Sequence, residues 1–357
     1  MSKSEVYSSF IHQNGTGMQK SKRLKDFKIL LSVLHLLVIC TSLFAQQKDS
    51  VYASEMKLPG VKMIPVLGKF KVWTRKMGNG PIKVLLLHGG PGNTHEYLQS
   101  LADSLASHGI EVYLYDQLGS YFSDAPDVVK DDTIWKMPMR VQELEDVRKG
   151  LGLDHFYLYG HSYGAALGLA YTHRYPKHIK GYIYSSMNTD FISFQARYGP
   201  YVDRYLDSLM RADTVGQRIM KNKDNHLAYD TASYQHMTDV YFRKTFLAET
   251  TTTPAVLITM KPHNNYQVAG EIQSHLFQSP ENQASLGEIK TPILLIAGDH
   301  DFTASPKDIE NIHRKLINSR FYIVANSGHM SMLDEPGDYD YQVLKFLTEV
   351  DTNKFLP

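Results

Sequence analysis

A serine between two glycines is the clearest chemical signal in this chain. The segment LYGHSYGAALGLAY, residues 158–171, places Ser162 in the pattern Gly-x-Ser-x-Gly. The residues before the serine have the apolar character of a strand, and those after it have the character of a helix. On such a tight turn Gly160 and Gly164 must be small, because the helix packs close behind the serine. The turn exposes the hydroxyl, which indicates nucleophilic chemistry.

Nucleophilic attack on a carbonyl also requires N–H groups that stabilise the developing oxyanion. The segment LLLHGGPGNTHEY, residues 85–97, ends an apolar run with a glycine-rich turn, where the main chain can approach a substrate closely. We predict that one donor is the backbone N–H of Gly90. The second is the N–H of Tyr163, the residue after the nucleophile.

The serine also needs a base and an acid that orients the base. His329, in VANSGHMSMLDEP, follows the last predicted strand. His161 adjoins the nucleophile, but on a sharp turn its side chain points elsewhere. The preceding strand ends in LLIAGDHDFTASP, which offers Asp299 and Asp301. We favour Asp301 and interpret Asp299 as a turn residue that hydrogen-bonds its own backbone. The order serine, aspartate, histidine is that of the α/β-hydrolase triad.

Alternating strands and helices are expected to position these residues. Strand-like segments cover residues 83–88, 111–116, 155–160, 181–186, 292–298 and 321–326, and helix-like segments cover 96–109, 140–152 and 308–317. Near-continuous apolar strands between amphipathic helices predict a mostly parallel sheet with helices on both faces. We therefore expect an α/β-hydrolase fold.

The alternation stops in the middle of the chain and then resumes. Residues 188–285 are rich in Tyr, His and Asp and contain helical runs such as YVDRYLDSLM. We predict a catalytic domain formed by residues 46–187 and 286–357, with residues 188–285 inserted as a mainly helical cap over the site.

The N-terminal 45 residues are typical of a secretory signal peptide. A basic cluster over residues 20–28 precedes the apolar run ILLSVLHLLVICTSLFA, and Ala45 fits the last residue before cleavage. Met18 is a possible start. We expect an exported protein, periplasmic or secreted, with no membrane span in the mature chain. An uncleaved membrane anchor is the alternative, although the run is shorter than the roughly 20 residues that a span needs. The only cysteine, Cys40, would leave with the signal.

Composition excludes some classes of partner. The 357 residues are 43% hydrophobic and 21% charged, with a formal net charge of +1, as in ordinary soluble proteins. The charges are mixed along the chain and form no basic stripe, so we expect no nucleic-acid partner. Composition leaves the oligomeric state open.

Five motifs in order resemble one family. HGGPG, DQLGSYFSDAPD, GHSYGAALGLAY, GDHDFTASP and SGHMSMLDEP are together similar to the prolyl aminopeptidase (proline iminopeptidase) family of α/β-hydrolases, which includes the tricorn-interacting aminopeptidase. The resemblance covers about residues 68–187 and 289–347. It implies Ser162, Asp301 and His329 as the triad, Gly90 and Tyr163 at the oxyanion hole, and no metal or organic cofactor.

Two positions depart from the family's pattern. Tyr121 stands where the family's D-Q-x-G-x-G-x-S has its second glycine. In PHNNYQVAG, Asn265 stands where the family has a glutamate that binds the free α-ammonium of the substrate. An amide accepts a hydrogen bond from an ammonium but does not neutralise it. Glu249 and Glu271 lie nearby in sequence and are candidate replacements, although each is also typical of a solvated surface carboxylate.

Three functions are compatible with these observations. The resemblance implies a serine aminopeptidase that releases an N-terminal residue, proline, from short peptides through an acyl-enzyme. The first alternative is an esterase or amidase whose cap does not require a free amine on its small substrate. The second is a non-catalytic binding protein on a hydrolase scaffold, against which the intact triad argues.

Overall fold

The computed structural model describes residues 50–127, 132–189, 255–260, 263–278 and 286–357, with residues 211, 214 and 217. The chain divides into two compact units, residues 1–58 and 59–357. In the first unit, residues 50–55 are helical. Within these described ranges, no helix is both long enough and apolar enough to cross a bilayer.

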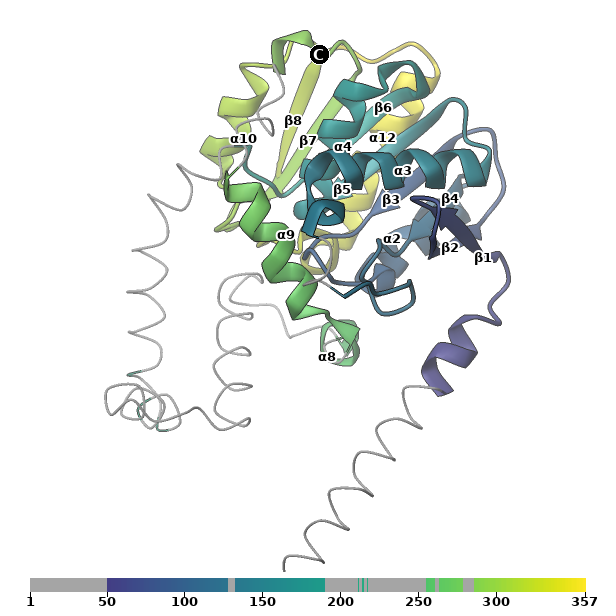
Figure 1. The fold of residues 1–357 in the computed structure, drawn as a ribbon. Helices are drawn as coiled ribbons and strands as arrows, with labels where there is room; N and C mark the ends of the chain where they lie inside the picture. The colour runs from purple at the N-terminus through teal and green to yellow at the C-terminus, as the bar shows by residue number, and fades with distance from the viewer. Residues whose placement is uncertain are drawn as a thin grey trace, which may run out of the picture. The chain divides into compact units, whose positions relative to one another are not determined.

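One sheet forms the centre of the second unit (Figure 1). Among the described residues it has eight strands in the order β1-β2-β4-β3-β5-β6-β7-β8. The strands are β1 (Val61–Val66), β2 (Phe70–Met77), β3 (Lys83–Leu87), β4 (Glu111–Tyr115), β5 (Phe156–His161), β6 (Ile179–Ser185), β7 (Ile293–Gly298) and β8 (Ser319–Val324). β1 and β2 pair antiparallel with each other, and β2 pairs antiparallel with β4. The remaining pairs are parallel, as predicted.

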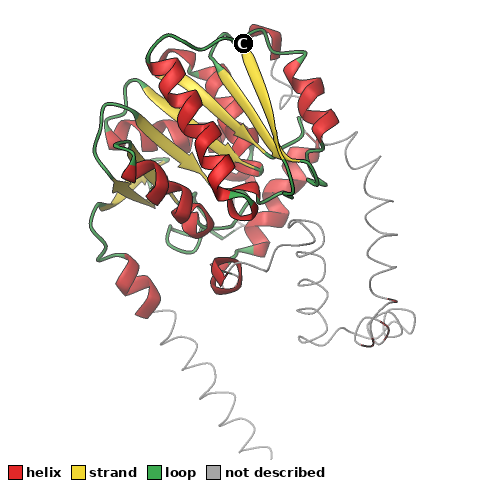
Figure 2. Ribbon diagram, turned by 180° about the vertical axis from the view of Figure 1, so that it is seen from behind, coloured by secondary structure: helices red, strands yellow, loops and turns green. Residues whose placement is uncertain are grey.

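Helices cover both faces of this sheet. On one face lie α3 (Met137–Leu151), α4 (Tyr163–Arg174) and α10 (Pro306–His313) (Figure 1). On the other face lie α2 (Gln99–Ser107) and α12 (Pro336–Asp351), which Figure 2 shows from behind. Short elements join them: α11 (Ser331–Asp334) and the 3₁₀ turns η1 (His95–Leu98), η2 (Asp132–Trp135), η3 (Pro176–His178) and η6 (Leu286–Glu288).

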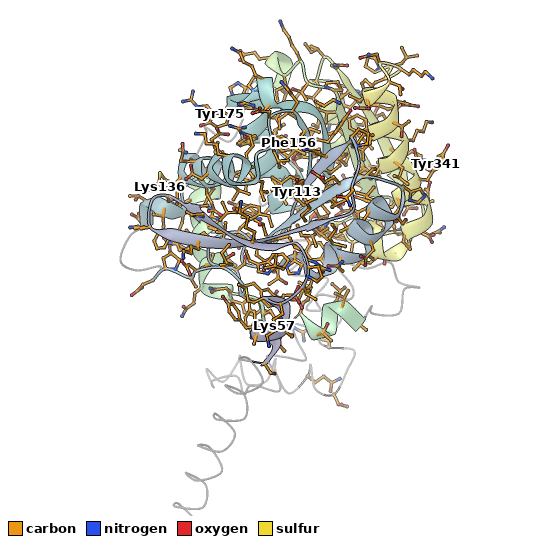
Figure 3. The ribbon with its side chains drawn as sticks, turned by 90° about the vertical axis from the view of Figure 1, so that its right-hand side faces the viewer. Lys57, Tyr113, Lys136, Phe156, Tyr175 and Tyr341 are labelled. Carbon is orange, nitrogen blue, oxygen red and sulfur yellow. The ribbon has the colours of Figure 1, made fainter. Side chains whose placement is uncertain are left out.

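Burial of the central strands explains their apolar sequences. Every residue of β4, β5 and β7 is buried, because helices cover both of their faces. Tyr113 on β4 and Phe156 on β5 belong to this core, whereas Tyr341 on α12 is 58% exposed (Figure 3). Glu111 begins β4 as a buried charge, and Lys76 lies 2.6 Å from its carboxylate. The pairing compensates its loss of hydration.

Only part of the predicted cap lies within the described residues. There, α8 (Ala255–Thr259) and α9 (Tyr266–Gln278) are helical. Val268 and Ile272 on α9 join the hydrophobic core that packs against the sheet. The Val268 methyl groups lie 2.9 Å from the place that a Cβ would take at Gly119. The second half of the cap segment therefore packs directly on a loop of the sheet domain.

The small residues predicted around Ser162 have a clear steric cause. A Cβ added at Gly164 would lie 2.4 Å from the carbonyl oxygen of Leu87 and 2.6 Å from that of His88. A Cβ at Gly160 would lie 2.4 Å from the carbonyl oxygen of Gly164. Both contacts are with backbone atoms, so no side-chain rotation relieves them. The prediction that these two positions must be small is confirmed.

We expect Gly164→Ala to lower the free energy of unfolding by about 2 kcal/mol or more, because the new methyl group must push α4 away from β3. Gly337→Ala is the matched control. Gly337 lies in the first turn of α12 with open space around it, so alanine there should raise stability by up to about 1 kcal/mol. Urea unfolding of both variants measures the difference, and equal stabilities would contradict the proposed packing constraint.

Candidate active site

Ser162 occupies a strained turn between β5 and α4. Its φ is 53° and its ψ is −126°, a backbone conformation that residues other than glycine rarely adopt. The turn is held at both ends: the N–H of Ser162 donates to the carbonyl of Ser185 at 2.9 Å, and the N–H of Ala165 donates to the carbonyl of Ser162 at 2.8 Å. The surrounding backbone thus maintains the conformation that presents the hydroxyl.

Asp301 and His329 meet at the ends of β7 and β8, as the sequence predicted. The Nδ1 atom of His329 lies 3.2 Å from each carboxylate oxygen of Asp301, and both residues are buried. Burial acts to raise the pKa of Asp301, but His329 and hydrogen bonds from Thr303 outweigh it and lower the pKa below its ordinary value. Asp301 is therefore ionised near neutral pH and suited to stabilise an imidazolium.

Thr303 is a contact of the Asp301–His329 pair that the sequence analysis missed. Its hydroxyl lies 2.6 Å from Nδ1 of His329 and donates to Oδ1 of Asp301 at 2.9 Å. Because the hydroxyl proton is used on the aspartate, the threonine oxygen must accept from Nδ1. Asp301 and Thr303 both therefore require the proton of neutral His329 on Nδ1. The lone pair of Nε2 is then free to accept the proton of a serine hydroxyl.

Asp299 forms different hydrogen bonds from those predicted. Its carboxylate accepts from the N–H of Ser327 at 3.0 Å and lies 2.7 Å from Nδ1 of His300. The prediction of a bond within its own turn was wrong, because the loops after β7 and β8 lie side by side and supply a nearer donor. Asp299 thus fastens the loop that carries His329, while Asp301 contacts the imidazole itself.

The backbone at the two candidate oxyanion donors is compatible with the predicted role. Gly90 has a φ of 115°, and Tyr163 is the first residue of α4, where an N–H has no acceptor within the helix. The N–H of Gly89 is already used, because it donates to the Tyr97 hydroxyl at 2.5 Å. Among the described residues, no group accepts from the N–H of Gly90. This arrangement favours Gly90 over Gly89 as the donor to substrate.

A buried histidine links the oxyanion turn to the loop of residues 116–120. Nε2 of His88 accepts from the N–H of Gln117 at 3.1 Å, so its Nδ1 proton donates to the carbonyl of Gly89 at 2.8 Å. The Gln117 side chain donates to the carbonyl of His88 at 2.8 Å. Burial lowers the pKa of His88, which keeps the imidazole neutral in this role.

A buried ion pair supports the same loop from below. Arg140 and Glu143 on α3 are both fully buried and 2.5 Å apart. Glu143 accepts from the N–H of Leu118 at 2.8 Å, and Arg140 donates to the carbonyl of Leu118 at 3.3 Å. Loss of one partner would leave an uncompensated buried charge. The pair therefore fixes the loop that faces the oxyanion turn.

The side-chain amide of Asn265 forms hydrogen bonds with the backbone of the protein itself. Its Nδ2 donates to the carbonyl of Gly119 at 2.9 Å, and its Oδ1 accepts from the N–H of Val268 at 3.2 Å. Its backbone N–H donates to the carbonyl of Gly92 at 2.8 Å. Asn265 therefore joins the start of α9 to the oxyanion turn.

The two glutamates suggested as replacements differ in what the structure shows. Glu271 lies on α9, with its carboxylate 3.3 Å from Nε2 of His275 one helical turn away. Glu249 lies outside the described residues. The amine-binding roles of Asn265, Glu249 and Glu271 stay predictions.

Tyr121, the second departure, contacts the cap segment. Its ring stacks on His263 with centroids 4.3 Å apart and an interplanar angle of 29°. Nδ1 of His263 lies 2.7 Å from a carboxylate oxygen of Glu96, which also accepts from the Thr94 hydroxyl at 2.6 Å. These contacts between distant segments had no sequence signal beyond the unusual tyrosine itself.

We expect labelling of Ser162 by a fluorophosphonate to slow in acid through the uptake of one proton. Only neutral His329 can accept the serine proton. Burial with the neighbouring His329 lowers the pKa of His161 to about 3, so His161 stays neutral down to about pH 5, and burial also lowers the pKa of His88.

The rate should therefore fall by at most about tenfold per pH unit, and Ser162→Ala should show no labelling at all. A labelling rate that does not fall in acid would contradict His329 as the base. A steeper fall would show that a second histidine protonates.

Comparisons with known proteins agree with this geometry. Residues 83–336 match the family model of the alpha/beta hydrolase fold. The chain is 32% identical over 310 residues to a proline iminopeptidase of Flavobacterium johnsoniae, covering 82% of this chain and 99% of that relative. Two crystal structures share the fold. VinJ has a TM-score of 0.63 at 22% identity and covers 81% of this chain and 98% of its own. The proline iminopeptidase of Mycobacterium smegmatis has a TM-score of 0.62 at 19% identity, with 83% and 100% covered. The chain is therefore a serine hydrolase and belongs to the proline iminopeptidase family of α/β-hydrolases.

Proposed function

We propose that this protein is a serine aminopeptidase that removes an N-terminal residue, proline, from short peptides. The observations that carry the proposal are the buried Asp301–His329 pair and the strained turn of Ser162 after β5, in a chain that is 32% identical to a proline iminopeptidase over nearly the whole of that relative. Family membership favours a peptide substrate, and the triad supplies acyl-transfer chemistry.

We propose the following roles for the site residues in the reaction. Nε2 of His329 takes the hydroxyl proton as Ser162 attacks the carbonyl carbon of the N-terminal residue. The N–H groups of Gly90 and Tyr163 stabilise the oxyanion that develops. His329 then gives the proton to the leaving amine, and the acyl-enzyme forms. Water, activated by the same imidazole, releases the free amino acid. Ionised Asp301 stabilises the imidazolium in both steps.

Recognition of the substrate's ammonium requires a carboxylate, since an unpaired charge in a closed pocket costs several kcal/mol. Asn265 carries no charge, and both Nδ2 and Oδ1 of its side-chain amide form hydrogen bonds within the protein. We propose that Glu249, at the end of YFRKTFLAE, supplies the negative charge. The same observation on Asn265 supports the alternative function, an esterase or amidase without selectivity for a free amine.

We expect the wild type to cleave prolyl-arylamide and to reject its N-acetylated form. Glu249→Gln should raise KM for the free-amine substrate about tenfold or more, while hydrolysis of a small neutral aryl ester changes little, because the triad is untouched. Glu271→Gln tests the other candidate carboxylate, which already has His275 as its partner. It should leave both KM values near those of the wild type.

Equal cleavage of prolyl-arylamide and its N-acetylated form by the wild type would replace the aminopeptidase proposal with the esterase or amidase alternative. Steady-state kinetics on the mature chain decides between them.

We also propose that the protein is exported and that residues 1–45 are removed as a signal peptide. The basic cluster, the short apolar run and Ala45 support this proposal. The mature protein would then be periplasmic or secreted. N-terminal sequencing of exported protein should find a terminus close to Gln46. Recovery of the intact apolar run in the membrane fraction would favour the uncleaved anchor instead.

A further inference from the structure

Two buried side chains link the three loops that carry the reacting groups. The N–H of Gly89 donates to the Tyr97 hydroxyl at 2.5 Å, and that hydroxyl lies 2.9 Å from Nδ1 of His161. Nε2 of His161 lies 2.9 Å from the backbone carbonyl oxygen of His329. The three hydrogen bonds form one unbranched chain from the oxyanion turn, past the residue before the nucleophile, to the base.

The direction of every proton in this chain is set by its two ends. A backbone N–H can only donate, so the oxygen of Tyr97 accepts from Gly89 and its own proton must go to Nδ1 of His161. A carbonyl can only accept, so Nε2 of His161 must carry the other proton. Neutral His161 in this one tautomer satisfies all three bonds. His161 therefore cannot act as the catalytic base. This agrees with the sequence analysis, which excluded it from that role.

Burial makes this arrangement permanent at ordinary pH. Tyr97 is 1% exposed and His161 is 2% exposed. Burial, together with the neighbouring His329, lowers the pKa of His161 to about 3, and burial raises that of the Tyr97 phenol well above its ordinary value. Neither group changes charge while the enzyme works, so their contribution is geometric.

Each end of this chain of hydrogen bonds lies next to a reacting group. Gly89 precedes the oxyanion donor Gly90, and a Cβ at Gly89 would lie 2.8 Å from that of Ser162. His161 directly precedes the nucleophile. At the other end, the His161 and His329 rings lie 4.8 Å apart. Asp301 orients the imidazole of the base, and the bond from His161 holds the carbonyl of the same residue.

We propose that Tyr97 and His161 are positioning residues that set the distances between the oxyanion donor, the nucleophile and the base. The proposal rests on the serine-hydrolase chemistry of the site and not on its peptide substrate. Misplacement of reacting groups by about 1 Å can slow a reaction by about 100-fold. Removal of either side chain should therefore slow acylation of Ser162 while leaving reagent binding almost unchanged.

The test measures fluorophosphonate labelling of Ser162 over a range of reagent concentrations, which separates the maximal rate from half-saturation. We expect Tyr97→Phe to lower the maximal rate by about 10- to 100-fold, with less than a threefold change in half-saturation. Tyr159→Phe is the matched control. Tyr159 is equally buried on β5, and its hydroxyl bonds to that of Tyr339 at 2.8 Å, outside the chain of three bonds. This control should label at the rate of the wild type.

Two variants of His161 test the same proposal. They also provide the test if Tyr97→Phe does not fold. The planar amide in His161→Gln carries one acceptor and one donor, so it can replace both nitrogens. His161→Leu can replace neither. We expect the glutamine variant to keep a maximal rate within about fivefold of the wild type and the leucine variant to lose about 10- to 100-fold. Thermal unfolding confirms that each variant is folded.

Two results would overturn the proposal. One is a folded Tyr97→Phe that labels as fast as Tyr159→Phe. The other is equal labelling of His161→Gln and His161→Leu, since both would show that the hydrogen bonds do not position the reacting groups. A wild type that is not labelled at all would refute the serine-hydrolase chemistry, and the positioning role with it. This result is distinct from a labelled enzyme that merely rejects prolyl-arylamide.

Discussion

The close approach of α4 to β3 is the constraint on which the rest of the site depends. Only hydrogen atoms fit at Gly160, Gly164 and Gly89, where a Cβ would meet backbone atoms or Ser162 at 3 Å or less. This approach places the N-terminus of α4 against the oxyanion turn. The strained backbone of Ser162 is a result of the same packing, because a relaxed turn would carry the helix away from the sheet.

Burial and local hydrogen bonds then determine which side chains around this turn are charged. His88 and His161 lose affinity for protons and serve as neutral hydrogen-bonding groups. Asp301 stays ionised because His329 and Thr303 stabilise its carboxylate more than burial destabilises it. An environment with one fixed negative charge and neutral neighbours favours a transient positive charge on His329. The fold thereby reserves proton transfer for one of several clustered histidines.

Local patterns made the sheet and the Asp301–His329 pair predictable. Long-range contacts between side chains could not be predicted from such patterns. Ser162, Asp301 and His329 each follow an apolar strand and lie in a short motif, so the sequence alone indicated their roles. Thr303 had no such signal, although it lies only two residues after Asp301. The bonds of Tyr97 to His161 and of His263 to Glu96 join residues far apart in the chain. No periodicity or spacing reports such pairs, and Asp299 was misassigned for the same reason.

The bonds of Asn265 limit how this position can change during evolution. Its amide is a donor toward Gly119 and an acceptor toward Val268, and no carboxylate can supply both. A glutamate here would oppose its negative charge to the Gly119 carbonyl and lose the bond that holds the loop of residues 116–120. Exchange between asparagine and glutamate therefore requires a compensating change in that loop. Position 265 is thus structurally coupled to the loop of residues 116–120, so replacing this one side chain also changes the support of that loop.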